Sequence, residues 1–146
     1  SRVVWLDGKG QFGASLEAVR RHLRRTRHRR VLVSAINDPS ALGALRAFEE
    51  AGRGHACVVA GQNASLEGRS ELRKASTRFI GSVAYFPERY GPAVVKLCLD
   101  ILDGKRVPPA VFVKHQLVTR DNVDRLYAND AVLASGDLDS LLLRAR

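Results

Sequence analysis

The sequence predicts an α/β domain in which a parallel sheet has helices on both faces. Short apolar runs of strand length alternate with helical patterns of ten or more residues along most of the chain. Strands that are joined through helices usually pair in parallel, because the crossover returns the chain to the same edge of the sheet. The 146 residues, of which 45% are hydrophobic, suffice for one hydrophobic core. No stretch of about 18 uncharged apolar residues predicts a membrane span.

The first predicted elements are a strand at 3–6, a glycine-rich turn and a helix. Leu16, Val19 and Leu23 recur at helical spacing, and Ser15 is the candidate cap of that helix. Because the chain opens on a strand without an initiator Met or a signal-peptide pattern, we expect it to be a fragment or a processed product.

The next strand is expected at 31–36, where a continuous apolar run is typical of a strand that is covered on both faces. A helix follows, with Asp38 as its cap, Pro39 in its first turn and Gly52 just after its end. The buried stripe of that helix is predicted to comprise Ala41, Leu45 and Phe48.

The remaining elements continue the alternation. We expect strand 55–61, helix 64–76, strand 79–85, helix 88–104, strand 111–119 and a short helical turn at 121–127. Cys57 and Cys98 lie in apolar stretches without metal-ligand spacing, which predicts buried free thiols.

Gly8, Gly10 and Gly13 follow the first expected strand in the spacing G-x-G-x-x-G. In that setting the spacing is the fingerprint of a dinucleotide-binding loop, so an NAD-dependent enzyme is one alternative. The acid that would bind the ribose is Asp38, but Asp38 directly precedes Pro39 and is better placed as a helix cap. We therefore interpret the glycines as a turn between strand and helix.

The formal charge of +9 is concentrated in one short segment. Seven arginines without an acidic residue among them contribute seven of these charges, and the rest of the chain carries +2; they are Arg20, Arg21, Arg24, Arg25, Arg27, Arg29 and Arg30. Cations at a helix C-terminus interact favourably with its dipole, so a solvated helix end is the preferred interpretation. A contact with phosphate or nucleic acid is the alternative, although no interleaved aromatic residue offers base stacking.

The sequence shows no catalytic or metal-binding pattern. Its four histidines lack metal-ligand spacing, and its serines lack a nucleophile-elbow setting, so we expect neither an enzyme nor a metal or cofactor site. Ligands of such sheets bind at the carboxyl ends of the strands. The loops there carry the neutral groups of Asn37, Gln62, Asn63 and Tyr85, which suit a polyhydroxylated neutral ligand such as a sugar. The alternative is that these residues serve only as turns and caps.

The order of several motifs resembles the C-terminal part of the type-I periplasmic binding proteins, the sugar-binding components of ABC transporters. The most specific motifs are the helix start NDPSALGAL and the ending LVTRDNV. The resemblance covers roughly residues 1–130 and leaves 131–146 as a C-terminal tail. The lactose-repressor-like transcription regulators share the fold and the helix start, and they are the alternative.

The resemblance implies that Asn37 matches a ligand-binding Asn of the family, Asn63 an Asp, and Tyr85 a polar residue that closes a strand. Gln62 falls where the family has an aromatic residue, so Gln62 and Asn63 are departures from the pattern. It also implies a partial lobe, with a first lobe missing before Ser1 and a helix from Glu88 to Asp103 that would pack on it.

The apolar stripe of that helix would then be exposed, and we expect the fragment to self-associate. The further implied partners are a sugar and a transporter permease, with a periplasmic or extracellular, membrane-anchored location. For a regulator the implied partner is DNA, bound through an upstream domain, and the location is cytoplasmic.

Overall fold

A four-stranded sheet forms the centre of the computed structural model, which describes residues 3–130. The strands are β1 (Val31–Ser34), β2 (Cys57–Gln62), β3 (Phe79–Ala84) and β4 (Gln116–Val118), in that order across the sheet. β1, β2 and β3 are parallel, which confirms the α/β class, but β4 pairs with β3 in the antiparallel direction. The expectation of a wholly parallel sheet is therefore wrong at its last strand.

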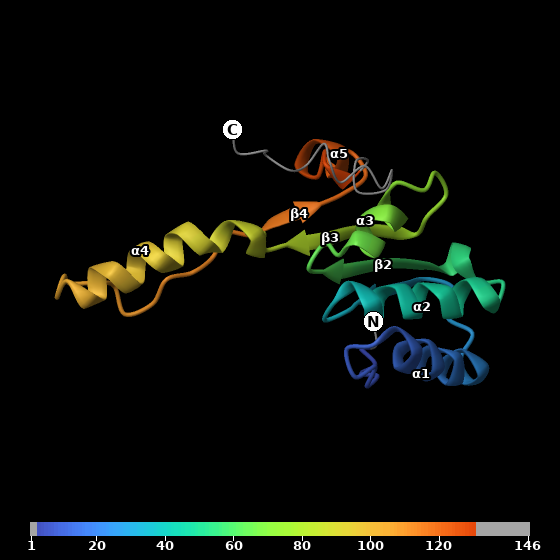
Figure 1. The fold of residues 1–146 in the computed structure, drawn as a ribbon. Helices are drawn as coiled ribbons and strands as arrows, with labels where there is room; N and C mark the ends of the chain where they lie inside the picture. Colours follow the sequence, from blue (N-terminus) through green and yellow to red (C-terminus); the bar gives the residue numbers. More distant parts are fainter. Residues whose placement is uncertain (1–2, 131–146) are drawn as a thin grey trace.

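The helices are α1 (Phe12–Arg25), α2 (Asp38–Glu50), α3 (Leu66–Leu72), α4 (Tyr90–Leu102) and α5 (Val123–Leu126), with short 3-10 turns η1 (Gly54–Ala56) and η2 (Pro87–Arg89). α2 and α3 pack on the sheet, and α1 packs on the outside of α2 (Figure 1). α4 contacts η2 and leads away from the sheet instead of crossing back over it. The chain thus re-enters the sheet beside the end of β3, where it left the sheet, and β4 therefore runs antiparallel to β3.

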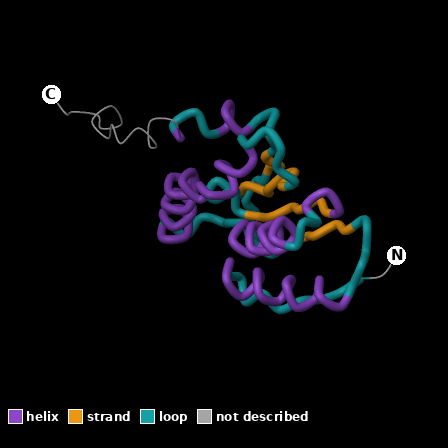
Figure 2. Tube along the Cα trace, turned by 90° about the vertical axis from the view of Figure 1, so that its right-hand side faces the viewer, coloured by secondary structure: helices purple, strands orange, loops and turns teal. Residues whose placement is uncertain are grey.

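The helices of residues 3–130 lie on one side of the sheet, not on both (Figure 2). On the opposite face the side chains of Leu32, Ile80 and Leu117 are half to three-quarters exposed. The continuous apolar run at 31–36 predicted a strand covered on both faces. This prediction is wrong, because β1 is covered on one face. Its burial alternates, because only the face toward α2 finds helical side chains to pack against.

The core lies between the sheet and α2. Phe48, Val59, Leu72 and Phe79 are its largest fully buried apolar side chains besides Val118 and Val123 of the β4–α5 segment. The stripe predicted for α2 is confirmed, since Ala41, Leu45 and Phe48 are all buried. The end of α2 is confirmed as well, because Gly52 follows it in the left-handed region with φ of 65°.

The expected first strand does not form. Residues 3–8 have no regular structure, and Trp5 within them is 91% exposed. Ser15 is not the cap of α1 but lies buried within it, where a Cβ at Gly8 would overlap its hydroxyl. Gly10 has a φ of 67°. Close approach at Gly8 and a left-handed backbone at Gly10 therefore explain two glycines of the G-x-G-x-x-G spacing as a turn.

α4 and the return segment 103–115, together called the arm, project from the body of the molecule (Figure 1). No residue of α4 is buried: of the apolar stripe predicted for this helix, Val94 and Ile101 are more than half exposed and Leu97 is half-buried. Val95, Leu99 and Leu102 are also more than half exposed. Cys98 in the same helix is exposed, which corrects its prediction as a buried thiol, whereas Cys57 is buried. The expected strand 111–119 is reduced to β4, because residues 111–115 belong to the arm.

The crossing of α1 over α2 depends on the absence of a side chain at Gly43. A Cβ at this position would overlap the carbonyl oxygen of Phe12 and approach the backbone nitrogen of Leu16 to 3.1 Å. Because both groups are backbone, Gly43→Ala is expected to lower the free energy of unfolding by about 2 kcal/mol. Urea denaturation measures the change. The control is Gly13→Ala in α1, where nothing lies within 4 Å of the added Cβ; its stability is expected to stay equal or to rise by up to about 1 kcal/mol.

Candidate functional site

The carboxyl ends of β1, β2 and β3 meet at one edge of the sheet, next to the start of the arm (Figure 1). Gln62 is the last residue of β2, Asn63 follows it, and Tyr85 follows β3. Asn37 comes three residues after β1, directly before α2. The four residues predicted from the sequence therefore lie at the loops of this edge, which we call the carboxyl edge.

Gln62 and Tyr85 contact each other directly. The hydroxyl of Tyr85 donates a hydrogen bond to Oε1 of Gln62, and both side chains are half-buried. The ring of His115 lies beside that of Tyr85, with 6.4 Å between the ring centroids and a tilt of 55°. Amide, phenol and imidazole groups thus share one surface, where they can exchange hydrogen bonds with a neutral ligand.

His115 is a residue that sequence reasoning did not assign to the site. It directly precedes β4, and β4 reaches the carboxyl edge only because it runs antiparallel to β3. The expected parallel strand 111–119 would have placed His115 in the middle of the strand and not at this edge, so the prediction of a parallel sheet concealed it. The direction of β4 was the missing signal.

Asn37 is engaged at both ends of its side-chain amide. Its Oδ1 accepts a hydrogen bond of 3.0 Å from the backbone N–H of Ser40, and its Nδ2 donates one of 2.8 Å to the carbonyl oxygen of Gly10. Asn37, not Asp38, is therefore the N-cap of α2, which corrects the expected cap. The bond to Gly10 attaches the glycine turn before α1 to the start of α2. An amide has two protons and two oxygen lone pairs, so the Asn37 side chain can still donate one hydrogen bond and accept one.

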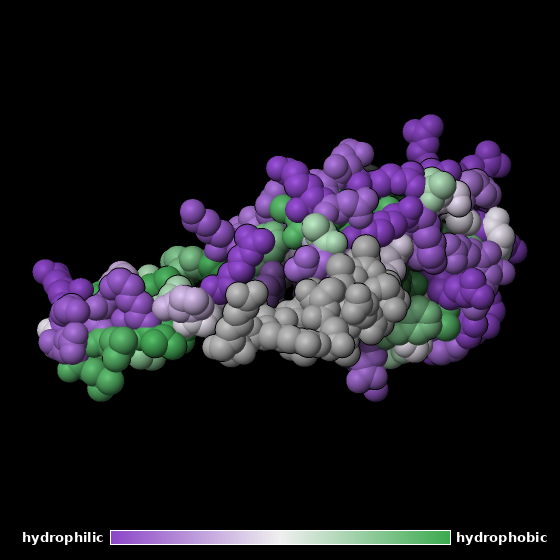
Figure 3. Space-filling view, turned by 45° about the horizontal axis from the view of Figure 1, so that its top comes forward, coloured by the Kyte–Doolittle hydropathy of each residue, from purple (hydrophilic) through white to green (hydrophobic). Residues whose placement is uncertain are grey.

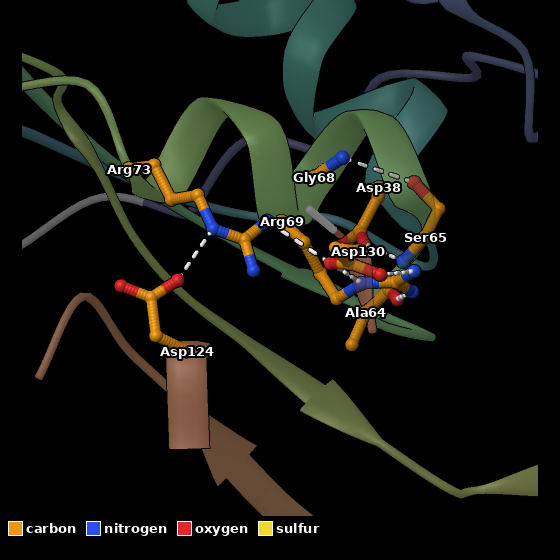
Figure 4. Close-up of polar contacts among 8 residues, drawn as sticks. All are labelled: Asp38, Ala64, Ser65, Gly68, Arg69, Arg73, Asp124 and Asp130. Atoms are coloured by element: carbon orange, nitrogen blue, oxygen red, sulfur yellow. Dashed lines mark hydrogen bonds and ion pairs between the residues drawn. The ribbon is translucent and has the colours of Figure 1, made fainter. Parts of the chain in front are cut away.

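Asp38 lies just beneath the carboxyl edge and is fully buried. Its carboxylate accepts hydrogen bonds of 2.6 Å from the hydroxyl of Ser82 in β3 and 2.6 Å from the backbone N–H of Ser65 (Figure 4). The Ser82 oxygen in turn accepts one of 2.9 Å from the backbone N–H of Ala64. Burial raises the pKa of Asp38, and the bonds from Ser82 and Ser65 oppose that rise. The buried carboxylate thus joins the start of α2, the loop after β2 and strand β3 beneath the edge.

Four non-glycine residues of the described chain have a positive φ: Lys9 (51°), Asn63 (92°), Ala64 (48°) and Phe86 (53°). Asn63 and Ala64 follow β2, Phe86 follows β3, and Lys9 lies in the turn that Asn37 binds. L-residues adopt this region at an energetic cost, and such residues cluster where a binding or catalytic surface requires an unusual backbone. Strain and neutral polar groups therefore coincide at the carboxyl edge.

A second polar cluster holds the loop after β2 in place (Figure 4). Arg69 donates two hydrogen bonds of 2.7 Å to the two oxygens of Asp130 and one of 2.6 Å to the carbonyl oxygen of Ala64. Its guanidinium lies 4.1 Å from the ring centroid of Tyr127, and Arg73 adds a bond of 3.0 Å to Asp130. Burial raises the pKa of Asp130, but the bonds from Arg69 and Arg73 outweigh it and hold that pKa below its usual value.

Residues 3–130 contain no group of three or more His, Cys, Asp or Glu side chains that could hold a metal ion. No helix among these residues is both long and apolar enough to cross a membrane. The arrangement at the carboxyl edge is one of neutral hydrogen-bonding groups on a fixed backbone, and it is suited to binding.

No protein-family model matches the sequence, and no curated protein matches it. Solved structures do. A solute-binding protein of an ABC transporter from Bacillus halodurans C-125, with bound myo-inositol, is similar over 83% of this chain and 41% of its own, with 27% identity and a TM-score of 0.66. The fructose-binding periplasmic domain of a hybrid two-component system is similar over 90% of this chain and 43% of its own length, with 25% identity and a TM-score of 0.68.

A third similar structure is an ABC transporter solute-binding protein from Agrobacterium vitis with bound allitol, with 20% identity over 81% of this chain and a TM-score of 0.72. It too is matched over only 41% of its length. The chain therefore spans about two fifths of the length of the proteins it resembles in structure. The resemblance predicted from the sequence motifs is confirmed at the level of the fold, and the chain has the fold of a part of the type-I periplasmic binding proteins.

Proposed function

We propose that this chain binds a small neutral sugar or polyol as part of the solute-binding component of an ABC uptake transporter. The observation that carries the proposal is the carboxyl edge, where Gln62, Asn63 and Tyr85 present neutral hydrogen-bonding groups on a strained, fixed backbone, beside the ring of His115. Three structural neighbours with bound D-allose, glycerol and myo-inositol support a ligand of this class. The proposal involves no reaction, because these groups bind a ligand without changing it.

In this proposal, residues 1–130 form the C-terminal part of the binding domain, and 131–146, which lie outside the described residues, form its tail. A first lobe before Ser1 supplies the other half of the cleft, and the complete protein acts at a permease in the periplasm or on the cell exterior. The short share of each neighbour that the chain spans supports this view.

The test is calorimetric titration of the complete protein, first lobe included, with D-allose, fructose, myo-inositol, allitol and glycerol. For a ligand that binds, Tyr85→Phe is expected to weaken binding about 5-fold to 10-fold, because one hydrogen bond is lost. Tyr90→Phe at the start of α4 is the matched control and is expected to leave the affinity unchanged. A folded protein that binds none of these ligands contradicts the proposal.

A lactose-repressor-like regulator, which senses a sugar in the cytoplasm and binds DNA through an upstream domain, is the alternative. The buried free thiol of Cys57 and the exposed one of Cys98 fit a reducing compartment. The sequence encoded before Ser1 separates the two functions: a signal peptide supports the transporter component, and a helix-turn-helix supports the regulator.

The exposed stripe of α4 leads to a separate expectation about this chain by itself. Val95, Leu99 and Leu102 lie on one helix face, and all are more than half exposed. We expect the chain to self-associate at micromolar concentration in sedimentation velocity, since association removes this apolar surface from water. Val95→Lys combined with Leu99→Lys is expected to shift the chain to monomer. A wild-type chain that sediments only as a monomer refutes the expectation.

A further inference from the structure

The fold collects positive charge at the edge of the sheet opposite the carboxyl edge. Eight exposed arginines define what we call the basic end surface: Arg21, Arg24, Arg25, Arg27, Arg29, Arg30, Arg78 and Arg120. Six of them belong to the last turns of α1 and the loop before β1, one precedes β3 and one follows β4. Because β4 runs antiparallel to β3, the end of β4 and the starts of β1 and β3 lie at the same edge.

The end of α1 is fixed at this edge by Arg53, which lies just before η1 and β2. The guanidinium of Arg53 donates hydrogen bonds of 2.9 Å to the carbonyl oxygen of Thr26 and 2.7 Å to that of His28. These bonds hold the arginines between residues 21 and 30 next to the start of β2. Hydrophilic side chains gather at this end of the molecule, on the right of Figure 3.

The charge of this surface is not neutralised within the described part of the chain. None of its eight arginines forms an ion pair with an acidic residue between 3 and 130, and no acidic residue occurs from 18 to 37. The nearby Glu17 and Glu50 are already paired with Arg20, and Glu71 with Lys74. Unpaired charges of one sign add to a field that attracts anions over about 8 Å in physiological salt.

We propose that the basic end surface binds the anionic phospholipid surface of a lipid bilayer. Guanidinium groups bind phosphate oxygens well, and each arginine near an anionic membrane surface adds to the attraction between the protein and the membrane. The arginines come from four segments that end at one side of the domain, so several can touch a plane together. Single-stranded nucleic acid is less favoured, because residues 13–30 contain no aromatic side chain other than two histidines on which bases could stack.

Duplex DNA is also less favoured, because α1, which carries three of the eight arginines, is packed against α2 and does not project into a groove. Binding of a bilayer at this end leaves the carboxyl edge, at the other end of the strands, open to its ligand. The inference does not depend on which ligand the carboxyl edge binds.

The test is co-sedimentation of the purified chain with vesicles at 0.1 M salt. We expect binding to vesicles with 30% phosphatidylglycerol in phosphatidylcholine, loss of that binding at 0.5 M salt, and no binding to pure phosphatidylcholine. The variant Arg24→Gln, Arg27→Gln, Arg29→Gln is expected to bind about 100-fold more weakly, since each arginine contributes about 5-fold. All three side chains are exposed, so circular dichroism is expected to show an unchanged fold.

The control variant Lys96→Gln, Arg106→Gln, Lys114→Gln removes the same charge from exposed positions in the arm. It is expected to bind the anionic vesicles within 3-fold of the wild-type chain. Equal weakening by both variants, equal binding to both kinds of vesicle, or tighter binding to a 20-base-pair DNA duplex than to the anionic vesicles at the same salt overturns the proposal. Displacement from the vesicles by 10 mM inorganic phosphate also overturns it, because that result assigns the arginines to a free anion.

Discussion

Replacing Asp38 with alanine is expected to lower the free energy of unfolding by about 3 kcal/mol. The carboxylate is fully buried and accepts hydrogen bonds from the Ser82 hydroxyl and the Ser65 backbone N–H. Its removal leaves both donors without that partner in a site that water does not reach. It also leaves a cavity against Gly61 and Gly68, which lie so close that a Cβ on either would overlap the Asp38 carboxylate.

Urea denaturation at pH 7 measures this loss, with Asp121→Ala as the control. Asp121 is exposed, and the same change there is expected to alter stability by less than about 0.5 kcal/mol. The loss of stability in Asp38→Asn is expected to lie between those of Asp38→Ala and Asp121→Ala. The amide oxygen still accepts one hydrogen bond, but the amide nitrogen, itself a donor, faces the other donor. If Asp38→Ala is as stable as Asp121→Ala, the carboxylate does not hold these loops together.

Asp38 also connects stability to the proposed ligand site. It fixes Ser65 and, through Ser82, the backbone of Ala64, and these residues directly follow Asn63 at the carboxyl edge. The positive φ of Asn63 and Ala64 persists only where surrounding bonds hold it. The buried network is thus the reason that a strained loop can present Asn63 in one conformation.

Local sequence patterns predicted what depends on local structure. The apolar periodicity and the cap residues correctly indicated α2 with its buried Phe48, and the short apolar runs indicated β2 and β3. The run at 3–6 has the same composition but finds no partner strand among the described residues, so Trp5 stays exposed. The stretch Asn37-Asp38-Pro39 contains two residues able to cap a helix, and the sequence could not distinguish them, because the choice depends on Ser82 and Ser65 far along the chain.

The direction of β4 and the ion pairs of the C-terminal segment depend on contacts between distant residues. Arg69 and Asp130 are 61 residues apart, and no periodicity or spacing relates them. His115 was missed for the same reason, since its place depends on how the arm leaves and rejoins the sheet. The positions of Gln62, Asn63 and Tyr85 could be predicted, because each directly ends or follows a strand that the pattern already indicated.

Replacing Arg69 with methionine is expected to lower the free energy of unfolding by about 3 kcal/mol. The side chains of Arg69 and Asp130 are only 13% and 8% exposed, so the change leaves Asp130 with a single cationic partner, Arg73. It also removes the bond to the Ala64 carbonyl oxygen and the contact with Tyr127. Arg125→Met, at an exposed position of α5, is the control and is expected to change stability by less than about 0.5 kcal/mol. A stability of Arg69→Met equal to this control refutes the prediction.

The same ion pair predicts how acid unfolds the chain. Because the bonds from Arg69 and Arg73 hold the pKa of Asp130 below its unfolded value, the charged form stabilises the fold above about pH 4. That stabilisation is lost as the pH falls from about 4 through the folded pKa. Asp130→Asn is therefore expected to be less stable at pH 7 but to lose less stability between pH 5 and pH 2 than the wild-type chain.

Asp38 is expected to act in the opposite direction, since burial raises its pKa and the folded chain binds that proton more tightly than the unfolded chain. Its titration adds stability as the pH falls, so Asp38→Asn is expected to steepen the acid loss that Asp130→Asn reduces. Thermal unfolding of both variants at several pH values between 2 and 7 measures the two slopes. Equal slopes in both variants would contradict the opposite shifts expected for the two pKa values. The contacts of Asp130 with Arg69 and Arg73, and of Asp38 with Ser65 and Ser82, would then not determine how stability changes with pH.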